Sequence, residues 1–458
     1  MKRILSLSSV AALLAAVLLS SCCGPAVREE SVSCAVPPRA EGQTDVLGLR
    51  CPALDTVRVA FIGLGNRGKE AVKRFTHLEG VRVVALCDLV KEYVDRSQAT
   101  LAKAGLPAAA GYYASDEDWK KVCERPDVDL VYICTDWSTH TPMAVYAMRQ
   151  GKHVAVEVPA ALTVEECWQL VDAAEQTRRH CMMLENCCYD FFEMTTLNMA
   201  QKGLFGEIVH VEGAYIHDLR NNNFSPDFYH DMWRLKYNAA HTGNPYPTHG
   251  LGPVCQILNI HRGDRMEYLV SLSSDQFGLS EEAVRRFGAG SPQAEEEYRL
   301  GDMNTTLIRT ARGKTIMIQH DVTSPRPYSR LHTVSGTRGF AQKYPVQGIA
   351  LPPDTHRFLP AEQLRDTLAK YEHPITREVG EQARRVGGHG GMDFIMDYRL
   401  VYCLRNGLPL DQDVYDAAEW SVLVPLTEES VRRGGQPVPV PDFTRGAWDK
   451  LKGLKLAE

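Results

Sequence analysis

The sequence of 458 residues lacks the patterns that mark several large classes of protein. The apolar run from Val10 to Leu19 has only ten residues, and a membrane-spanning helix needs about 20. Positive charge is not in excess, because 51 Lys and Arg stand against 57 Asp and Glu, so no nucleic-acid partner is expected. There is no internal repeat. With 44% hydrophobic and 24% charged residues, the chain has the composition of globular domains.

The 13 cysteines do not follow a metal-binding or disulfide pattern. No Cys-x-x-Cys pair occurs, Cys187 and Cys188 are adjacent, and no histidine pair has metal spacing on an evident helix, so no metal site is expected. The Gly-x-Ser-x-Gly turn of serine hydrolases is missing too. Nine cysteines lie beyond residue 54, an odd number, and we expect most of them to be small buried apolar side chains.

The N-terminus has the features of an export signal. Lys2 and Arg3 precede the short apolar run, and Leu19-Ser20-Ser21-Cys22 matches a bacterial lipobox. We therefore expect residues 1–21 to be removed and Cys22 to carry lipid, which makes the protein an exported lipoprotein anchored at the periplasmic face or the cell surface. The alternative is an ordinary signal peptide with a chance cysteine. Residues 22–54, rich in Pro, Glu, Ser and Gly, are expected to form a tether.

Residues 55–188 alternate between strand-like and helical patterns. Short apolar runs predict strands near 56–62, 81–87, 128–135, 153–158 and 181–185, and the segments between them predict helices at 69–78, 91–104, 116–124, 141–150 and 163–179. This rhythm indicates a doubly wound parallel sheet of the Rossmann type. The chain is thus an α/β protein in its first domain.

From residue 189 to 458 the rhythm changes. After a helix at 191–202, strand-like stretches follow at 208–216, 268–274, 304–309, 314–321 and 331–335 with few helices between them. Helical patterns return at 392–405 and 413–433. We expect a second, α+β domain with an open, mostly antiparallel sheet and C-terminal helices.

A glycine-rich loop follows the first strand. Gly63-Leu64-Gly65-Asn66-Arg67-Gly68 has the spacing G-x-G-x-x-G between a strand and a helix, where backbone N–H groups can approach a pyrophosphate. Asp88, at the end of the second strand, can accept hydrogen bonds from a ribose and repels a 2′-phosphate, which favours NAD over NADP. A glycine turn with a capping aspartate is the alternative interpretation.

Several segments resemble the Gfo/Idh/MocA oxidoreductases, and within them glycoside hydrolase family 109, the NAD-dependent α-N-acetylgalactosaminidases. The wider resemblance is carried by Thr135-Asp136-Trp137-Ser138-Thr139-His140 and by Glu157-Val158-Pro159, which is similar to an E-K-P signature. The narrower one is carried by the glycine loop, Glu157–Ala161, Glu185–Tyr189, Tyr215–Arg220, Tyr246–Pro253 and Gly387–Asp393. These segments span most of the chain after residue 56.

The departures from the oxidoreductase pattern are informative. Val158 stands where the dehydrogenases of the wider family use a lysine for proton transfer, and Pro245 stands four residues before His249, where they usually have an aspartate. The hydrolase family shows the same valine, so the departure favours the narrower resemblance.

The resemblance implies a redox-assisted hydrolysis of terminal α-N-acetylgalactosamine on glycans or glycoconjugates. NAD transiently oxidises C3, the leaving group departs by C1–C2 elimination, water adds, and the hydride returns. It also implies a pocket, and the residues with substrate or acid–base roles are Tyr215, Arg234, Tyr246, Pro247, Thr248, His249 and Tyr328, with His389 as a further candidate. The expected cofactor residues are Gly63, Gly65, Asn66, Arg67, Asp88, Trp137, Ser138, Thr139, His140, Glu157, Val158 and Asn186.

Other interpretations stay open. His249 and His389 can be structural hydrogen bonders, Tyr215 a plain strand aromatic, and Tyr328 part of an ordinary loop. A sugar or cyclitol dehydrogenase would share the glycine loop and Asp88, and a sugar-binding lipoprotein would keep the fold without bound nucleotide. Base and acid are not assigned among the candidates, and a homo-oligomer is left open.

Overall fold

The computed structural model describes residues 33–456 of the chain. The expected signal peptide and the lipidation site at Cys22 lie outside these residues. No helix in the described part combines the length and apolarity that a membrane crossing requires.

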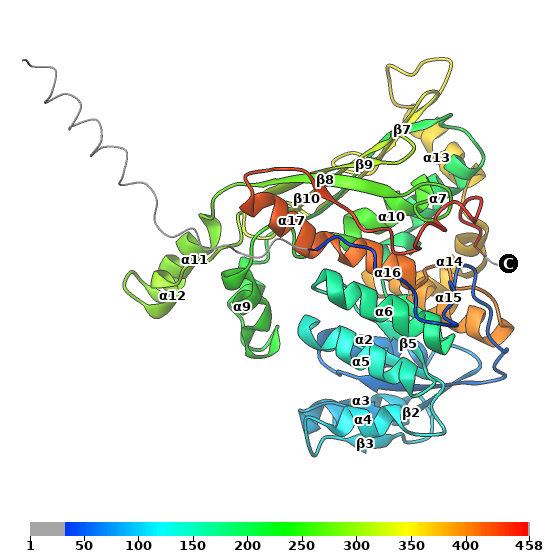
Figure 1. Cartoon of the computed structure of the whole chain (residues 1–458), viewed down its shortest axis with the longest axis vertical. Helices are drawn as coiled ribbons and strands as arrows, with labels where there is room; N and C mark the ends of the chain where they lie inside the picture. The colour runs from blue at the N-terminus through cyan, green and yellow to red at the C-terminus, as the bar shows by residue number, and fades with distance from the viewer. Residues whose placement is uncertain (1–32, 457–458) are drawn as a thin grey trace, which may run out of the picture. The chain divides into compact units, whose positions relative to one another are not determined.

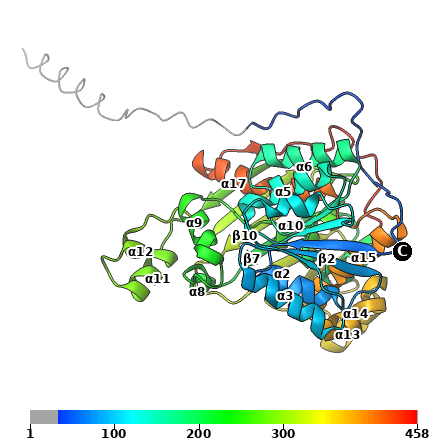
Figure 2. The same ribbon diagram turned by 90° about the horizontal axis from the view of Figure 1, so that it is seen from below.

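The first sheet has six parallel strands in the order β3-β2-β1-β4-β5-β6. Its strands are β1 (Val57–Ile62), β2 (Val81–Cys87), β3 (Ala110–Tyr112), β4 (Leu130–Ile133), β5 (His153–Val156) and β6 (Cys181–Met183). Its helices are α2 (Asn66–Phe75), α3 (Lys91–Lys103), α4 (Asp118–Cys123), α5 (Trp137–Arg149) and α6 (Val164–Thr177). Figures 1 and 2 show α5 and α6 on one face of the sheet and α2 and α3 on the other. The doubly wound prediction is confirmed; only the three-residue β3 was not expected.

Local side chains fix where these helices begin. Thr163 accepts a hydrogen bond from the Glu166 N–H at 3.0 Å, and the Glu166 carboxylate accepts one from the Thr163 N–H, a reciprocal cap at the start of α6. Asp136 accepts from the Ser138 N–H at 3.0 Å and begins α5. Each cap therefore fixes where its helix begins after the strand that precedes it, β4 for α5 and β5 for α6.

The second sheet has eight strands in the order β13-β12-β11-β7-β10-β9-β8-β14. They are β7 (Ile208–Ile216), β8 (Met266–Ser273), β9 (Asn304–Thr310), β10 (Thr315–Asp321), β11 (Ser329–Gly336), β12 (Phe340–Gln342), β13 (Gly348–Ala350) and β14 (Val438–Pro439). Six of its pairings are antiparallel and one, β7 with β10, is parallel. The prediction of a mostly antiparallel sheet is confirmed.

The second domain contains more helices than expected. They are η1 (Asn186–Tyr189), α7 (Phe191–Gln201), α8 (Arg220–Asn223), η2 (His230–Met232), α9 (Trp233–Ala240), α10 (Thr248–Leu258), α11 (Gly278–Phe287), α12 (Pro292–Glu295), α13 (Ala361–Lys370), α14 (Pro374–Val386), η3 (His389–Gly391), α15 (Met392–Asn406), α16 (Val414–Ser421) and α17 (Leu423–Arg432). The single helix expected at 413–433 is two helices. Pro425 has no N–H to donate to the carbonyl of Ser421, where α16 ends.

Helix α10 lies directly on β7 because two glycines face each other. A Cβ on Gly250 would lie 2.3 Å from the Ala214 nitrogen, and one on Gly213 would lie 2.1 Å from the Gly250 carbonyl oxygen. Larger residues at either position would force the helix away from the strand. The first turn of α10, which carries His249, is thereby held at a fixed height above the sheet.

The C-terminal helices return to the first domain. Helix α15 contacts β1 and α2, and Asp397 accepts hydrogen bonds from Tyr132 Oη at 2.8 Å and from Arg74 Nε at 2.6 Å. These groups are all buried. The second domain thus supplies part of the cover of the parallel sheet.

The described part of the segment before β1, residues 33–54, has no helix or strand. It nevertheless contacts the folded domains through Arg39, which donates to Glu175 at 2.9 Å, and through the Val46 N–H, which donates to Tyr415 Oη at 3.0 Å. The lack of periodicity in the sequence is therefore matched by irregular backbone, but the part from residue 34 onward is packed.

Cysteines act as core residues in the described chain. None of the nine from Cys87 to Cys403 forms a disulfide there, and all but Cys134 are buried. Burial raises the pKa of the thiols, that of Cys87 to about 12, so they stay protonated. The expectation of buried apolar cysteines is confirmed.

Candidate functional site

The glycine loop has the shape that a dinucleotide needs. Gly63 has φ +85°, and a Cβ there would lie 2.6 Å from the main-chain carbon of Cys134, while one on Gly68 would lie 1.9 Å from the Gly63 oxygen. Gly65 differs, because a Cβ there would meet nothing within 4 Å. The space beside Gly65, at the N-terminus of α2, is therefore open to a ligand, as an approaching pyrophosphate requires.

Asp88 secures this loop from the end of β2. Its carboxylate accepts hydrogen bonds from the Leu64 N–H at 2.6 Å and from the Val90 N–H at 2.8 Å. Each oxygen keeps a further lone pair, so the carboxylate can still accept from ribose hydroxyls. The residues present fit NAD, and the ribose contact itself stays a prediction.

A charged cluster lies next to the loop. Arg67 donates from Nε to Glu157 at 2.7 Å and from Nη1 to Asp393 at 3.1 Å, and Asp393 also contacts His389 Nδ1 at 2.9 Å and Asn186 Nδ2. Burial alone would raise the pKa of Asp393, but the positive charge of Arg67 and the His389 hydrogen bond hold it well below its usual value. Three predicted residues, Arg67, Asn186 and His389, thus meet around the carboxylate of Asp393, which was not predicted.

A second cluster is aromatic and is centred on Arg234. The buried guanidinium lies over the rings of Tyr246 and Trp137, with centroid distances of 4.6 and 5.0 Å, and Nη1 donates to Tyr229 Oη at 2.9 Å. Among residues 33–456, its buried Nη2 has no hydrogen-bond partner. An unpartnered guanidinium N–H beside stacked aromatic rings is suited to a polar ligand such as a sugar.

Tyr215 lies at the centre of a group of histidines on the second sheet. It points to the same face of β7 as His217, and its register partner on β10 is His320. The Tyr215 ring lies 4.7 Å from that of Tyr246 and 5.3 Å from that of His249. Burial lowers the pKa of His217 to about 4 and that of His320 to about 3, with Arg234 adding to both effects, so both are neutral at pH 7.

The tyrosines of the site are proton donors at neutral pH. Burial raises the pKa of Tyr215, of Tyr246 and of Tyr328 well above the usual value of about 10. Tyr328 is the most open of the three, with 40% of its surface exposed, and its ring lies 5.1 Å from that of His217. These phenols can therefore donate hydrogen bonds or protons to a bound ligand.

His249 is joined to a buried carboxylate. Its Nδ1 lies 2.8 Å from both oxygens of Glu185, which is fully buried at the end of the segment after β6. The His249 ring also packs edge-on against Tyr246 at 4.8 Å. The acid–base candidate therefore lies between two tyrosines and a glutamate.

Several other predicted residues make hydrogen bonds within the protein, and their contact with a cofactor stays a prediction. Both ring nitrogens of His140 face main-chain carbonyl oxygens, of Pro159 at 2.7 Å and of Thr135 at 3.1 Å, and the side chain is buried. Thr139 donates to Thr135 at 2.7 Å, and Ser138 and Pro247 lie at the first turns of α5 and α10. Asn66 reaches from the glycine loop to the carbonyl oxygen of Phe228.

Several site residues were not expected from the sequence. They are Glu185, His217, His320 and Asp393. His217 could have been found, because it lies two residues after Tyr215 on one strand and therefore on the same face. Glu185 and Asp393 stand within segments that carry the family resemblance, but nothing local in the sequence shows which partners they meet.

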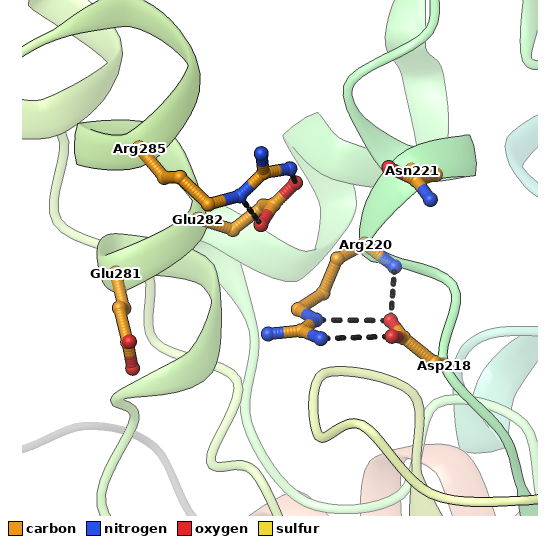
Figure 3. Close-up of a pocket in the computed structure, with 6 residues that line it drawn as sticks. All are labelled: Asp218, Arg220, Asn221, Glu281, Glu282 and Arg285. Atoms are coloured by element: carbon orange, nitrogen blue, oxygen red, sulfur yellow. Dashed lines mark hydrogen bonds and ion pairs between the residues drawn. The ribbon is translucent and has the colours of Figure 1, made fainter.

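A cavity of 280 Å³ opens nearby and is lined by charged side chains (Figure 3). Asp218 and Arg220 form a bidentate pair there at 2.9 and 2.8 Å, and Glu282 pairs with Arg285 at 2.5 Å. Four of its charged residues thus form two ion pairs with each other, whereas the Tyr215–His249 group includes the Arg234 Nη2, which has no hydrogen-bond partner within residues 33–456. We therefore place the candidate active site at the latter group.

The geometry agrees with what the chain resembles. Residues 57–185 match the oxidoreductase family with an NAD-binding Rossmann fold, and residues 189–450 match the C-terminal domain of glycosyl hydrolase 109. The chain is 62% identical over 411 residues to the alpha-N-acetylgalactosaminidase of Bacteroides fragilis, covering 89% of this chain and 96% of that protein. It is 59% identical to glycosyl hydrolase family 109 protein 2 of Phocaeicola vulgatus, and the match covers 88% of this chain and 98% of that protein.

Solved structures show the same fold at low identity. An oxidoreductase domain protein from Kribbella flavida superimposes with a TM-score of 0.63 at 18% identity, over 84% of this chain and all of that one. A levoglucosan dehydrogenase in complex with NADH and L-sorbose superimposes with a TM-score of 0.63 at 18% identity. The match covers 85% of this chain and all of that one. The fold of this chain is thus shared with these structures over both domains.

Proposed function

The chain belongs to glycosyl hydrolase family 109, and we propose that it hydrolyses terminal α-N-acetylgalactosamine from glycans or glycoconjugates with tightly bound NAD. Two observations support the proposal: Val158 is buried where the family resemblance places the proton-transfer lysine of dehydrogenases, and a group of titratable residues lies around His249. A net dehydrogenase acting through that lysine is disfavoured, because valine has no proton to transfer.

NAD would be held by the open loop at Gly65, by Asp88 and by the cluster of Arg67, Glu157 and Asn186. When bound, it supplies a reversible hydride acceptor for C3 of the sugar. The cluster around Asp393 keeps Arg67 in place from the opposite side, so the loop is braced before the ligand arrives.

The chain's own residues would manage the protons. A C3 ketone makes the C2 proton acidic, and a base must remove it; the imidazole of His249 would be that base. Tyr215 and Tyr246, whose pKa values are raised by burial, keep their protons and can donate to the sugar oxygens. Arg234, with an unpartnered N–H, can bind a hydroxyl or the acetamido oxygen.

The test is hydrolysis of an aryl α-N-acetylgalactosaminide in heavy water. Elimination and readdition of water predict deuterium at C2 of the released sugar and no accumulation of NADH. Product without deuterium at C2 would exclude the elimination route. Stoichiometric NADH from free sugar would instead favour a dehydrogenase.

We also propose that the protein is exported and anchored to a membrane through lipid on Cys22. The proposal depends on the lipobox Leu19–Cys22 and on Lys2 and Arg3 before the apolar run. Metabolic labelling with an alkyne fatty acid should mark the wild-type chain and leave Cys22→Ala unmarked. Equal labelling of both would refute the anchor at this position.

A further inference from the structure

We propose that Glu185 is the positioning residue of the active site, holding His249 in the tautomer that carries its proton on Nδ1 and leaves Nε2 free for the sugar. The inference depends on the proposed function in that His249 is taken as the proton-transfer group. Glu185 itself does not touch the reacting atoms.

The contact is short and symmetric. Nδ1 of His249 lies 2.8 Å from both carboxylate oxygens of Glu185, and the Cys187 N–H donates to Oε1 at 3.0 Å. Within residues 33–456, Nε2 of His249 has no hydrogen-bond partner in the protein, and 14% of the side chain is exposed. One ring nitrogen is thus fixed and the other is available.

The charge of Glu185 decides which way the hydrogen bond runs. Burial raises the pKa of this carboxyl, but His249 and the Cys187 N–H outweigh burial and hold it below its usual value. An ionised carboxylate only accepts, so Nδ1 of His249 must donate whether the ring is neutral or protonated. In the neutral ring, Nε2 is then the basic nitrogen.

Two features of the fold bring the pair together. Glu185 directly follows the strand region of β6, and its main-chain oxygen accepts from Gln412 Nε2 at 2.9 Å. On the other side, Gly252 of α10 makes room, since a Cβ there would lie 2.8 Å from Glu185 Cγ. Pro245 stands where the wider family usually has an aspartate four residues before the histidine. In this chain, Glu185 supplies a carboxylate to His249 from a different part of the sequence.

A metal ion is the competing explanation, because Glu185, Cys187 and His249 lie close enough to share one. The guanidinium of Arg330 argues against it. Its Nη1 lies 3.2 Å from Cys187 Sγ, so a positive charge already occupies the space beside that thiol. A cation there would meet this charge at short range.

The first experiment replaces the acid by its amide. In Glu185→Gln, an NH₂ group replaces one of the two carboxylate oxygens that face Nδ1 of His249. The Nδ1–H of the ring then faces a second donor, which disfavours this tautomer. We expect kcat for the aryl α-N-acetylgalactosaminide to fall at least ~10²-fold, as when the carboxylate of a serine-protease triad becomes an amide. KM and bound NAD should stay within about threefold of wild type, because Glu185 touches neither ligand.

The matched control is Glu419→Gln. Glu419 is also a buried glutamate, and its Oε2 lies 2.7 Å from Nδ1 of His261, outside the active site. The same chemical change there should affect stability and leave kcat within about threefold. A fall in kcat of similar size in both variants would show a general effect of the substitution and overturn the proposal.

A spectroscopic readout does not depend on turnover. In chain labelled with ¹⁵N-histidine, the His249 ring, assigned by its loss in His249→Asn, should show Nδ1 protonated and Nε2 bare at pH 8. Glu185→Gln should shift the ring toward the Nε2–H form, and so should Gly252→Ala, which displaces Glu185 without altering its charge. A wild-type ring already in the Nε2–H form would overturn the proposal.

The two hypotheses fail separately. If the wild-type protein does not release N-acetylgalactosamine, the proposed function fails, and the ring spectra still decide the role of Glu185. If hydrolysis proceeds but kcat of Glu185→Gln stays within about threefold of wild type, only the positioning role is refuted. Loss of activity on chelation, restored by Zn²⁺, would replace it with a metal site.

Discussion

The contact between α10 and β7 allows one substitution to test how tightly the active site is held. In Gly250→Ala the new Cβ would lie 2.3 Å from the Ala214 nitrogen, about 1 Å short of ordinary contact at 3.4 Å. The obstacle is strand backbone, which cannot rotate away, so α10 must move by roughly that distance. His249, the preceding residue, moves with it.

A displacement of ~1 Å at a reacting group can lower the rate about 10²-fold, which corresponds to about 2.7 kcal/mol of transition-state stabilisation. Overpacking should also lower the free energy of unfolding by ~1–3 kcal/mol. We expect kcat/KM to fall by about that factor while the chain keeps its NAD, because the glycine loop belongs to the other domain. Chemical denaturation measures the free energy of unfolding, and nucleotide absorbance after denaturation measures the bound NAD.

Gly380→Ala is the matched control. It is also a helical glycine, in α14, but its new Cβ would meet the ring edge of Phe191 at 2.8 Å, a side chain that can adjust. Its activity should be that of wild type. Retention of full kcat/KM in Gly250→Ala would refute the argument that the glycine contact sets the position of His249.

Three further outcomes are expected. Asp88→Ala should lose bound NAD, because the carboxylate orders Leu64 and is the expected ribose partner; nucleotide released on denaturation in wild-type amount would contradict this. Arg234→Lys should raise KM on the order of tenfold, because an ammonium group cannot contact Tyr229 and the rings of Trp137 and Tyr246 at once. An unchanged KM in steady-state assays would count against a sugar-binding role. Lowering the pH from 6.5 toward 4 should lower the free energy of unfolding, because His217 and His320, with pKa values of about 4 and 3, bind protons readily only after unfolding, so stability rises with pH across this window. Urea unfolding at a series of pH values checks the sign, and the same slope in His320→Gln would show that His320 does not contribute.

Much of the fold could be predicted because its signals are local. Strand 208–216 was predicted with the bounds of β7, and the first-domain alternation of strands and helices gave the parallel sheet. The misses were elements with weak local patterns. Strand β3 has only the residues Ala110–Tyr112, and α13 has no buried residue, so neither presents an apolar face to recognise.

For the candidate site, the sequence indicated residues that lie close together but not the contacts between them. Tyr215, Tyr246 and His249 were expected from segments, and the structure brings their rings within about 5 Å of one another. Glu185 is 64 residues from His249 along the chain, and their pairing depends on the contact of α10 with η1, which directly follows Glu185. Long-range packing of this kind leaves no local pattern in the sequence.

The carboxylate of Asp393 makes the glycine-rich turn at His389 and the cofactor loop mechanically interdependent. It bonds His389 from its own domain and Arg67 and Arg74 from the other, while Asn186 closes the remaining side. Any movement that pulls His389 away from this carboxylate also loosens the brace on Arg67. By reciprocity, a nucleotide that steadies Arg67 also steadies the turn. If NAD binds beside Arg67 as proposed, this shared carboxylate couples release of the nucleotide to opening of the turn at His389.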